Sequence, residues 1–522
     1  MTKYLLKRFL HGALSIICVV GIVMILVYSL MNRDLVFAND STYTHQSNNA
    51  KYTYMYQKWE EYGYLDYVPY ADYLSMLQKN GELDAETYES VAKLGNKASE
   101  DSKETAKYVK KFTEYYKSKG YTVERKDAVT KRGKVATGGT AILFAYKDES
   151  PLVRLWNYFT GIVTVDNIHY VQDDVGERGV TFYWRDPLYG GEKFSPCLIA
   201  NGAKHKYLIY TDSSFPFIHQ NIVSLNLGTS YTVNAGVDVT TTMTKSQGTY
   251  VSSPVIYPTG FEESSADDLH SAVYAPGSLK DNPVYQARFT DNYTSVLLNR
   301  SGRSKLGYSF LIGIIEVCLA YVVGFPLGIV MARRKDKLVD KIGTLYIVFI
   351  IAVPSLAYIF LFKAIGGKLG LPTTFSTENT RWQMYVLPII SLALPSIATL
   401  MKWMRRYMID QMNSDYVKFA RSGGLSEREI FSKHIMKNAS VPMLHSVPAD
   451  VLFAMTGAII TERVYSVPGA GNLLTIAINK YDNSVIVGMT LFYAVLSVVS
   501  LILGDVLMAV VDPRISFNTK AR

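Results

Sequence analysis

The chain has 522 residues, of which 48% are hydrophobic, and a formal net charge of +9. Its length allows two or more domains, and the mean hydropathy of +0.07 hides an asymmetry, because residues 32–305 are polar and 306–511 mostly apolar. The basic residues collect beside the apolar segments, which favours a membrane over nucleic acid as their partner. Only Cys197 of the three cysteines lies in the polar region, which excludes an internal disulfide there. We expect Cys197 to be a packed, unreactive side chain.

Six apolar segments are long enough to cross a bilayer, whose hydrocarbon core of about 30 Å takes about 20 helical residues. The first, near 10–31, follows Lys3, Lys7 and Arg8. Its length, and the lack of an A-x-A site after it, favour an uncleaved anchor over a signal peptide. The other five lie near 308–332, 343–364, 385–404, 446–466 and 486–511. The sequence therefore predicts a polytopic α-helical membrane protein with six transmembrane helices.

The polar region between the first two spans has sequence patterns of both helices and strands. Residues 85–118 have the composition of a helix, and from about 136 to 260 short β-rich runs such as "TAILFAY", "GVTFYW" and "KYLIYT" alternate with turn residues. The stretch 260–300 is rich in Ser, Asp and Pro and is interpreted as a return linker. We expect an inserted α+β domain. The sequence contains no metal-ligand spacing, no nucleophile motif and no G-x-x-x-x-G-K-[ST], so we predict neither a catalytic nor a metal site, and no ATP site in this chain.

The distribution of Lys and Arg among the short loops predicts the orientation in the membrane. The loops 333–341 and 405–445 are rich in basic residues, whereas the short loops on the other side have few. We therefore expect both termini and these two loops to be cytoplasmic and 32–305 to be extracellular. The predicted domains are an N-terminal stub and first span (1–31), the extracellular domain and linker (32–305), and the remaining permease domain (306–522).

One cytoplasmic stretch, "YVKFARSGGLSEREIFSKHIMKNASVP" at 416–442, has the signals of two short helices. Asp415 is the expected cap of the first helix, and Gly423 and Gly424 are expected to end it. Ser426 and Glu429 have the spacing of a capping box, which predicts the start of a second helix. One side of the first helix is expected to pack through Tyr416, Phe419 and Ala420.

The second helix is expected to run through Asn438, with Ile430, Phe431 and Ile435 available for packing and Pro442 marking its end. A basic loop lying on lipid is the alternative interpretation. It does not explain why a Gly pair is followed at once by a capping box. We interpret the stretch as a rigid elbow that docks into a partner protein.

This stretch resembles the cytoplasmic EAA loop of ABC importer permeases, in which E-A-A is followed by a Gly and then I-x-L-P. Lys418-Phe419-Ala420 stand at E-A-A, Gly424 at the Gly and 434–437 at I-x-L-P, so the first Glu and the final Pro are absent. The run "ARSGGLSE" at 420–427 is similar to the oligopeptide/dipeptide/nickel branch. Four further stretches also resemble this branch: 324–341, 386–396, 461–478 and "DPRI" at 512–515.

The polar region refines this resemblance. Residues 204–232 resemble the streptococcal Ami/Opp oligopeptide permease subunits that carry a large external insertion. This likeness implies a Gram-positive cell, an insertion over about 35–200 and a second inserted stretch near 240–300.

The resemblance implies a type I ABC importer permease fold and import of oligopeptides across the cell membrane. It also implies the partners: a second homologous permease, two ABC ATPases that bind the ATP and Mg, and a peptide-binding lipoprotein. No cofactor is implied in this chain, which would be a transport subunit and not an enzyme. The residues implied in coupling to the ATPase are Ala420, Arg421, Gly424, Leu425, Ser426, Glu427, Ile430 and His434.

Acidic residues inside apolar spans are costly and are therefore functional candidates. Glu316, Asp450 and Asp505 lie within predicted spans and Glu462 near an external helix end. Glu316, Asp450 and Glu462 are candidates for lining the translocation path, or alternatively for structural contacts between helices. Three other functions stay open at this point: import of nickel or another small solute, a membrane-anchored sensor, and a membrane enzyme.

Overall fold

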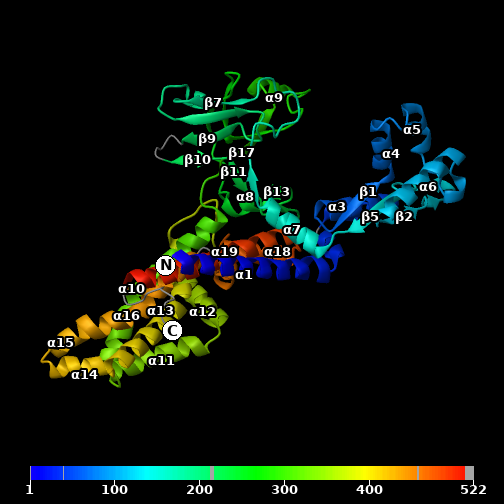
Figure 1. Cartoon of the computed structure of the whole chain (residues 1–522). Coiled ribbons are helices and arrows are strands. Elements are labelled where there is room, and N and C mark those ends of the chain that lie inside the picture. Colours follow the sequence, from blue (N-terminus) through cyan, green and yellow to red (C-terminus); the bar gives the residue numbers. More distant parts are fainter. Residues whose placement is uncertain (1, 39, 212–216, 455–457, 512–522) are drawn as a thin grey trace.

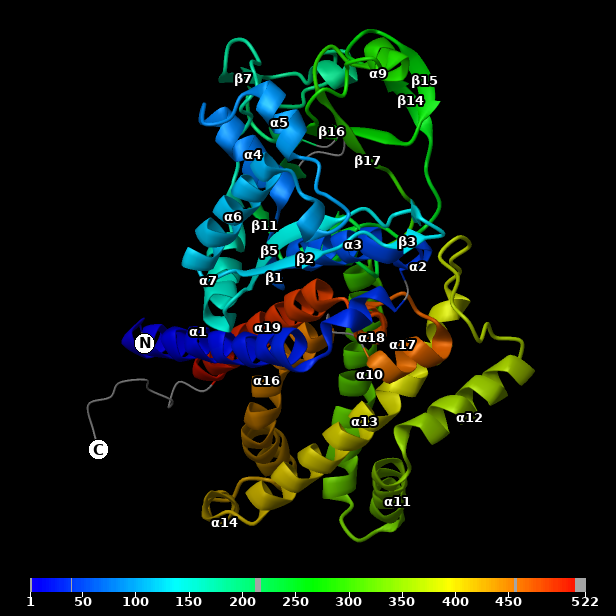
Figure 2. The ribbon, with the colours of Figure 1, turned by 90° about the vertical axis from the view of Figure 1, so that its right-hand side faces the viewer.

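The computed structural model of the chain describes residues 2–38, 40–211, 217–454 and 458–511 (Figure 1). The "DPRI" stretch and the basic tail therefore lie outside the described residues. A bundle of apolar helices forms one part of the molecule, and the polar region forms two lobes at one end of it (Figures 1 and 2).

Four described helices are long and apolar enough to cross a membrane. They are α1 (Thr2–Ile25, continued by the π-turn Leu26–Leu30), α10 (Lys305–Arg333), α13 (Gln383–Met412) and α19 (Asn483–Val511). The expected span at 343–364 is instead a pair, α11 (Leu338–Ala352) and α12 (Ser355–Lys368), bent by 106°. The bend falls at Pro354, which has no N–H to donate and restricts the residue before it. Counted as one span, this pair brings the described total to five.

The expected span at 446–466 corresponds to no single helix among the described residues. Helix α16 (Met436–Phe453) begins ten residues earlier than that span, and α17 (Ile459–Tyr465) follows after a stretch outside the described residues. Helix α18 (Ala470–Asn479) then leads into α19. The expectation that Pro442 ends a helix is wrong, since Pro442 and Pro448 both lie inside α16. Apolar helices tolerate internal Pro when neighbouring groups satisfy the freed backbone.

Close helix packing at glycines holds the bundle together. A Cβ on Gly324 of α10 would lie 3.0 Å from Ile397 O, and one on Gly328 would lie 2.8 Å from Met404 Cβ, both on α13. Small residues four apart allow two helix backbones to approach in this way. Helices α1 and α19 lie side by side in both views (Figures 1 and 2). There a Cβ on Gly12 would collide with Val498.

The first lobe of the polar region is an antiparallel sheet, in the order β1-β5-β2, with helices packed on it. Its core is rich in aromatic residues, such as Tyr56, Trp59 and Phe144. The expected helix at 85–118 is in fact two helices, because Gly95 lies against the backbone of Glu100 and Ser102 caps a new start. The elements are η2 (Arg33–Phe37), α2 (Ser41–His45), α3 (Asn48–Glu61), β1 (Leu65–Pro69), α4 (Tyr70–Lys79), α5 (Ala85–Val91), η3 (Ala98–Glu100), α6 (Lys103–Ser118), β2 (Thr122–Lys126), β3 (Thr130–Lys131), β4 (Lys134–Val135) and β5 (Ile142–Asp148).

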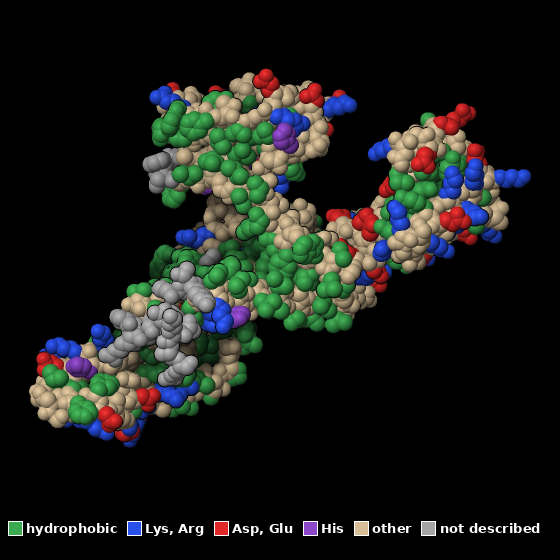
Figure 3. All heavy atoms as spheres, in the orientation of Figure 1, with side chains coloured by type: hydrophobic (Ala, Val, Ile, Leu, Met, Phe, Trp, Pro, Cys, Tyr) green, Lys and Arg blue, Asp and Glu red, His purple; other side chains and the backbone are tan. Residues whose placement is uncertain are grey.

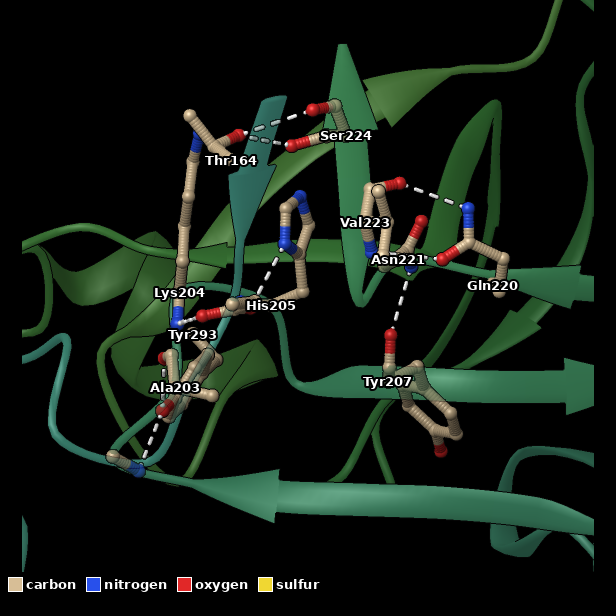
Figure 4. A network of polar contacts seen from close by, with 12 residues as sticks. Thr164, Ala203, Lys204, His205, Tyr207, Gln220, Asn221, Val223, Ser224 and Tyr293 are labelled. Carbon is tan, nitrogen blue, oxygen red and sulfur yellow. Dashed lines mark hydrogen bonds and ion pairs between the residues drawn. The ribbon is translucent and has the colours of Figure 1, made fainter. Parts of the chain in front are cut away.

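The second lobe follows α7 (Pro151–Gly161) and contains a four-stranded antiparallel sheet, in the order β10-β9-β8-β7. The three β-rich runs of the sequence coincide with β5, β7 and β9, as expected. Figure 4 shows polar contacts that fasten this lobe, among them Thr164 Oγ1 to Ser224 Oγ (2.7 Å) and Tyr293 Oη donating to Ala203 O (2.7 Å). The elements are β6 (Val163–Val165), β7 (Gly179–Tyr183), η4 (Pro187–Tyr189), β8 (Cys197–Asn201), β9 (Tyr207–Thr211), β10 (Ile218–Gln220), β11 (Val223–Leu225), β12 (Thr229–Ser230), β13 (Val237–Asp238), α8 (Val239–Thr244), β14 (Ser253–Ile256), β15 (Glu262–Ser265), β16 (Asp267–Tyr274), α9 (Pro283–Arg288) and β17 (Tyr293–Leu298).

Two expectations for this lobe can be compared with the structure. The interpretation of 260–300 as a linker is wrong, because β15, β16, α9 and β17 lie there and Tyr257, Leu269 and Phe289 form a small core. Cys197 is buried as expected, and its burial raises the pKa of the thiol to about 12. A thiol with that pKa is almost entirely protonated at neutral pH and is therefore a poor nucleophile.

Both lobes are fastened to the bundle at the turn between α18 and α19. Asp482 is fully buried, and its Oδ2 accepts hydrogen bonds from Ser230 Oγ (2.7 Å) and from three consecutive backbone N–H groups, at 231–233 (2.9–3.1 Å). The next residue, Asn483, donates from Nδ2 to Tyr64 Oη (2.6 Å) of the first lobe and to Val27 O (3.2 Å). This anchor therefore ties each lobe to the start of α19.

Candidate functional site

The elbow begins with α14 (Asp415–Ser422). The N-cap position is Ser414, so the expected cap is displaced by one residue and Asp415 is the first helical residue. Its carboxylate there faces the positive end of the helix dipole. The expected packing face is also partly wrong. Val417 is the buried residue, with 1% of its surface exposed, whereas Phe419 is 76% exposed.

The reason for the exposed Phe419 is geometric. Residues two positions apart in a helix, such as Val417 and Phe419, point in directions about 200° apart around the helix axis. Phe419 therefore points away from the core that Val417 enters. Tyr416 and Ala420 do pack against that core, as expected. The prediction that Phe419 is on the packing face is therefore wrong. Val417, the apolar residue next to Tyr416, is the sequence signal that indicates the correct face.

The end of α14 is a Schellman motif. Leu425 N–H donates to Ala420 O (3.2 Å) and Gly424 N–H to Arg421 O (3.1 Å), which are the two bonds that define this motif. Gly424 has φ of +81°, the left-handed conformation that favours glycine. A Cβ added to Gly424 would meet no atom within 4 Å. Glycine is therefore required at this position by the backbone conformation and not by lack of space.

The second helix of the elbow starts at the expected capping box. Ser426 Oγ accepts from Glu429 N–H (3.3 Å), and Glu429 Oε2 accepts from Ser426 N–H (3.3 Å). The short helix α15 (Glu427–Glu429) leads through a π-turn, η5 (Ile430–Ile435), into α16. The second arm of the elbow is thus continuous with a helix of the bundle.

A second contact bridges the turn on its outer side. Arg421 donates to both carboxylate oxygens of Glu427, from Nε to Oε1 (2.5 Å) and from Nη2 to Oε2 (3.1 Å). The hydrogen bonds and the positive charge of Arg421 lower the pKa of Glu427 below its ordinary value. Both side chains are exposed to solvent.

The elbow is attached to the bundle by buried apolar side chains. Ile430 is 0% exposed and belongs to one core with Val417, Met404 and Met408. Arg405 of α13 also holds Asp340 of α11 in a bidentate ion pair, with distances of 2.5 and 2.8 Å. The elbow is thus packed on helices that run through the bundle.

The residues implied in ATPase coupling lie close together in the structure but have different surroundings. Ile430 is buried, so its side chain is not available for the contact that the resemblance implied. Leu425 is 39% exposed, and Phe419, which was not among these residues, is more exposed. His434 is half-buried in the π-turn. The elbow lies at the end of the bundle opposite the two lobes (Figure 2).

A second candidate site is a cavity of about 600 Å³ inside the bundle, and all three candidate path acids line it. They come from three elements: Glu316 from α10, Asp450 from α16 and Glu462 from α17. Asp450 accepts a hydrogen bond from Tyr321 Oη (2.8 Å). Glu316 Oε1 has no hydrogen-bond partner among the described residues.

Glu462 differs from the other two acids because both its oxygens are engaged. Oε1 accepts from Ser309 Oγ (2.7 Å), and Oε2 accepts from the N–H of Asn472 near the start of α18 (2.8 Å). Ser309 Oγ in turn accepts from Ala470 N–H (2.8 Å). Asp505 lies outside the cavity, in an ion pair with Arg8 (3.2 Å).

A bundle of apolar helices that encloses a cavity lined by three acidic side chains and carries an elbow at one end has the architecture of a membrane transport subunit. Residues 324–517 match the family described as "Binding-protein-dependent transport system inner membrane component". Over 527 aligned residues the chain is 32% identical to the oligopeptide transport system permease protein AmiC of Streptococcus pneumoniae, covering 100% of this chain and 99% of that relative. The chain belongs to this family of ABC transporter permeases.

Shorter relatives align with only part of the chain. It is 31% identical over 282 residues to the dipeptide transport system permease protein DppB of Lactococcus lactis, covering 51% of this chain and 89% of that relative. It is 30% identical over 224 residues to the oligopeptide transport system permease protein AppB of Bacillus subtilis, covering 41% and 71%. The additional length of this chain is therefore shared with AmiC, whose alignment covers the whole chain.

Proposed function

We propose that this chain is the permease subunit of an ABC importer that carries oligopeptides into a Gram-positive cell. The elbow is the observation that carries this proposal, because it is rigid, is packed on the bundle and lies at the end opposite the lobes. The names of the relatives, which are oligopeptide and dipeptide permease proteins, support peptides as the substrate. The nickel, sensor and enzyme alternatives have no comparable support.

The proposed arrangement has six spans, with α16 and α17 completing the sixth. Both termini and the elbow are cytoplasmic, and the two lobes at 32–305 are extracellular. The partners are a second permease, two ATPases that bind ATP and Mg, and a peptide-binding lipoprotein. Because the elbow and the cavity share helices, a rigid-body movement of a docked elbow would reach the cavity. Phe419 and Leu425 supply the exposed apolar contact with the ATPase, and Ile430 holds the elbow in place.

The cavity is the proposed translocation path in this subunit. Glu316 lines it from α10 and Asp450 from α16, and the unpaired oxygen of Glu316 is suited to a hydrated passage. Glu462 instead holds the start of α18 through its two hydrogen bonds. Glu316→Gln should therefore slow peptide uptake without lowering the thermal midpoint, whereas Glu462→Gln should lower the midpoint. Equal effects of both substitutions on stability would contradict this division of roles.

The test of the coupling role is Gly424→Val in the complete complex, reconstituted in vesicles. A β-branched residue in the left-handed conformation costs at least about 1–2 kcal/mol, so the elbow should change its angle. Because a side chain at 424 meets no neighbour, the effect comes from the backbone alone. Peptide-stimulated ATP hydrolysis and uptake should be lost, while the binding protein still captures peptide.

The matched control is Gly423→Ala. Gly423 has φ of −76°, which any residue adopts, so this variant should retain uptake. Normal uptake in Gly424→Val vesicles would refute the coupling role. Loss of uptake in both variants would show that the turn tolerates no side chain at either position. The loss in Gly424→Val could then not be attributed to a changed angle of the elbow.

A further inference from the structure

Helix α7 joins the two lobes and exposes an apolar face. Its exposed apolar side chains are Leu152 (76%), Val153 (50%) and Trp156 (70%). They lie at spacings of three and four residues and so share one side of the helix. An exposed apolar patch of this kind marks a surface that another molecule or a membrane covers.

The opposite face of α7 is fixed to the rest of the chain. Arg154 is buried and donates to the backbone oxygens of Gly63 (2.8 Å) and Tyr64 (3.1 Å) in the first lobe. Its guanidinium also lies 4.5 Å from the ring centre of Tyr28, just beyond α1. A Cβ added to Gly21 of α1 would lie 3.4 Å from Leu155 Cδ2, so Leu155 packs close to α1 at this position. The direction in which the apolar face points is therefore set by buried contacts.

These contacts place α7 at a definite depth along the first span. The span covers Tyr4–Leu30, so its midpoint lies near residue 17. At about 1.5 Å per residue, Gly21 lies about 6 Å beyond that midpoint and Tyr28 about 16 Å. Half of a hydrocarbon core is about 15 Å thick. The contacts of α7 with the first span thus extend from the acyl chains to the headgroup level.

Two further observations agree with a lipid-covered face. Hydrophobic side chains gather over α1 and α7 as one surface (Figure 3). The exposed polar side chains of α7 are satisfied within the chain: Asn157 donates to Glu149 Oε1 (3.0 Å), and Thr160 donates to Trp156 O (2.9 Å). Polar groups that bond internally can enter a bilayer at little cost, and Trp is favoured at the membrane interface.

We propose that α7 is an interfacial membrane helix, with Leu152, Val153 and Trp156 in contact with lipid of the outer leaflet. The proposal rests on the orientation given under the proposed function. In this arrangement the lobes stand on the membrane through α7 as well as through their chain connections. The connection between the lobes is then part of the membrane-embedded region and not of the extracellular domain.

The test uses the complete complex in vesicles with and without lipids brominated on their acyl chains, which quench nearby Trp emission. The emission of Trp156 is obtained by subtracting the spectrum of Trp156→Phe from that of the parent. We expect most of it to be lost in brominated vesicles and to be little affected by aqueous acrylamide. Trp184, which is 65% exposed and follows β7, provides the control. The Trp184→Phe difference should respond to acrylamide and not to brominated lipid.

Two outcomes would overturn the proposal. Quenching of Trp156 by acrylamide alone would place α7 in water, and quenching by neither agent would show that a protein partner covers it. Peptide uptake by the same vesicles tests the proposed function separately. If the parent complex takes up no peptide, the proposed function fails, and the quenching still decides where α7 lies.

Discussion

The elbow and the anchor at Asp482 achieve rigidity in opposite ways. In the elbow, the polar bonds join residues no more than six positions apart, such as Arg421 to Glu427, and these side chains are exposed. At the anchor, Asp482 is fully buried and accepts hydrogen bonds from residues about 250 positions away. The elbow is thus stiffened by its own turn, whereas the anchor depends on the folding of the lobes onto the bundle.

This difference predicts that substitutions at the anchor affect stability and that substitutions at the elbow affect transport. A buried carboxylate that loses its partners, or donors that lose their carboxylate, incur a full desolvation penalty. Exposed bonds within a turn are replaced by water at little cost. Substitutions at the anchor should therefore lower stability and release the lobes from the bundle. Substitutions at the elbow should change transport without unfolding the protein.

The largest effect is expected for Asp482→Ala. It leaves Ser230 Oγ and three backbone N–H groups without their acceptor, and each unsatisfied buried donor costs about 1–3 kcal/mol. We expect a loss of at least about 3 kcal/mol in the free energy of unfolding, because backbone donors cannot turn away. Thermal unfolding of the purified complex and limited proteolysis between the lobes and the bundle would measure it.

Asp34→Ala is the control for this prediction, since Asp34 is an exposed aspartate in η2 of the first lobe. It should leave the thermal midpoint unchanged. If Asp482→Ala were as stable as Asp34→Ala, the lobes would be held by other contacts and the contrast with the elbow would be lost.

An intermediate effect is expected for Ser426→Ala in the capping box. Loss of an N-cap side chain costs about 1 kcal/mol of helix stability, and here that cost falls on the start of α15. We expect lower peptide uptake with an unchanged global midpoint, because Ile430 still anchors the arm. Ser426→Thr, which keeps the hydroxyl, should restore uptake. A fall in the global midpoint would show that the elbow is not an independent local structure.

The same contrast explains what the sequence could predict. The Gly pair and the Ser426–Glu429 spacing describe contacts within a few residues, so the Gly turn and the capping box of the elbow were predicted correctly. The N-cap of α14 was misplaced by one residue, and the end of the second helix was wrong. Phe419 was misplaced because its burial depends on which side the bundle lies. The bonds to Asp482 were missed, because nothing local to "KYDNS" indicates that a turn 250 residues earlier will supply four donors. Pro354 lies at a bend, whereas α16 continues through Pro442 and Pro448. Whether an apolar helix bends at a Pro or continues through it depends on the neighbouring helices, and so these boundaries were also missed.

The smallest effect is expected for Glu427→Gln, which sharpens the comparison from the side of the elbow. Arg421 lowers the pKa of Glu427, so the stabilising contribution of the pair is present at neutral pH, above the ordinary carboxyl pKa. It is lost only as the pH falls through the lowered pKa. Because both side chains are exposed, water screens the pair even at low salt, and its contribution is too small to shift the midpoint. The thermal midpoints of Glu427→Gln and of the parent should therefore coincide at neutral pH, in low and in high salt. A lower midpoint in the variant that high salt abolishes would mean that this surface pair does contribute to the fold, and the elbow would then resemble the anchor more than its exposure suggests.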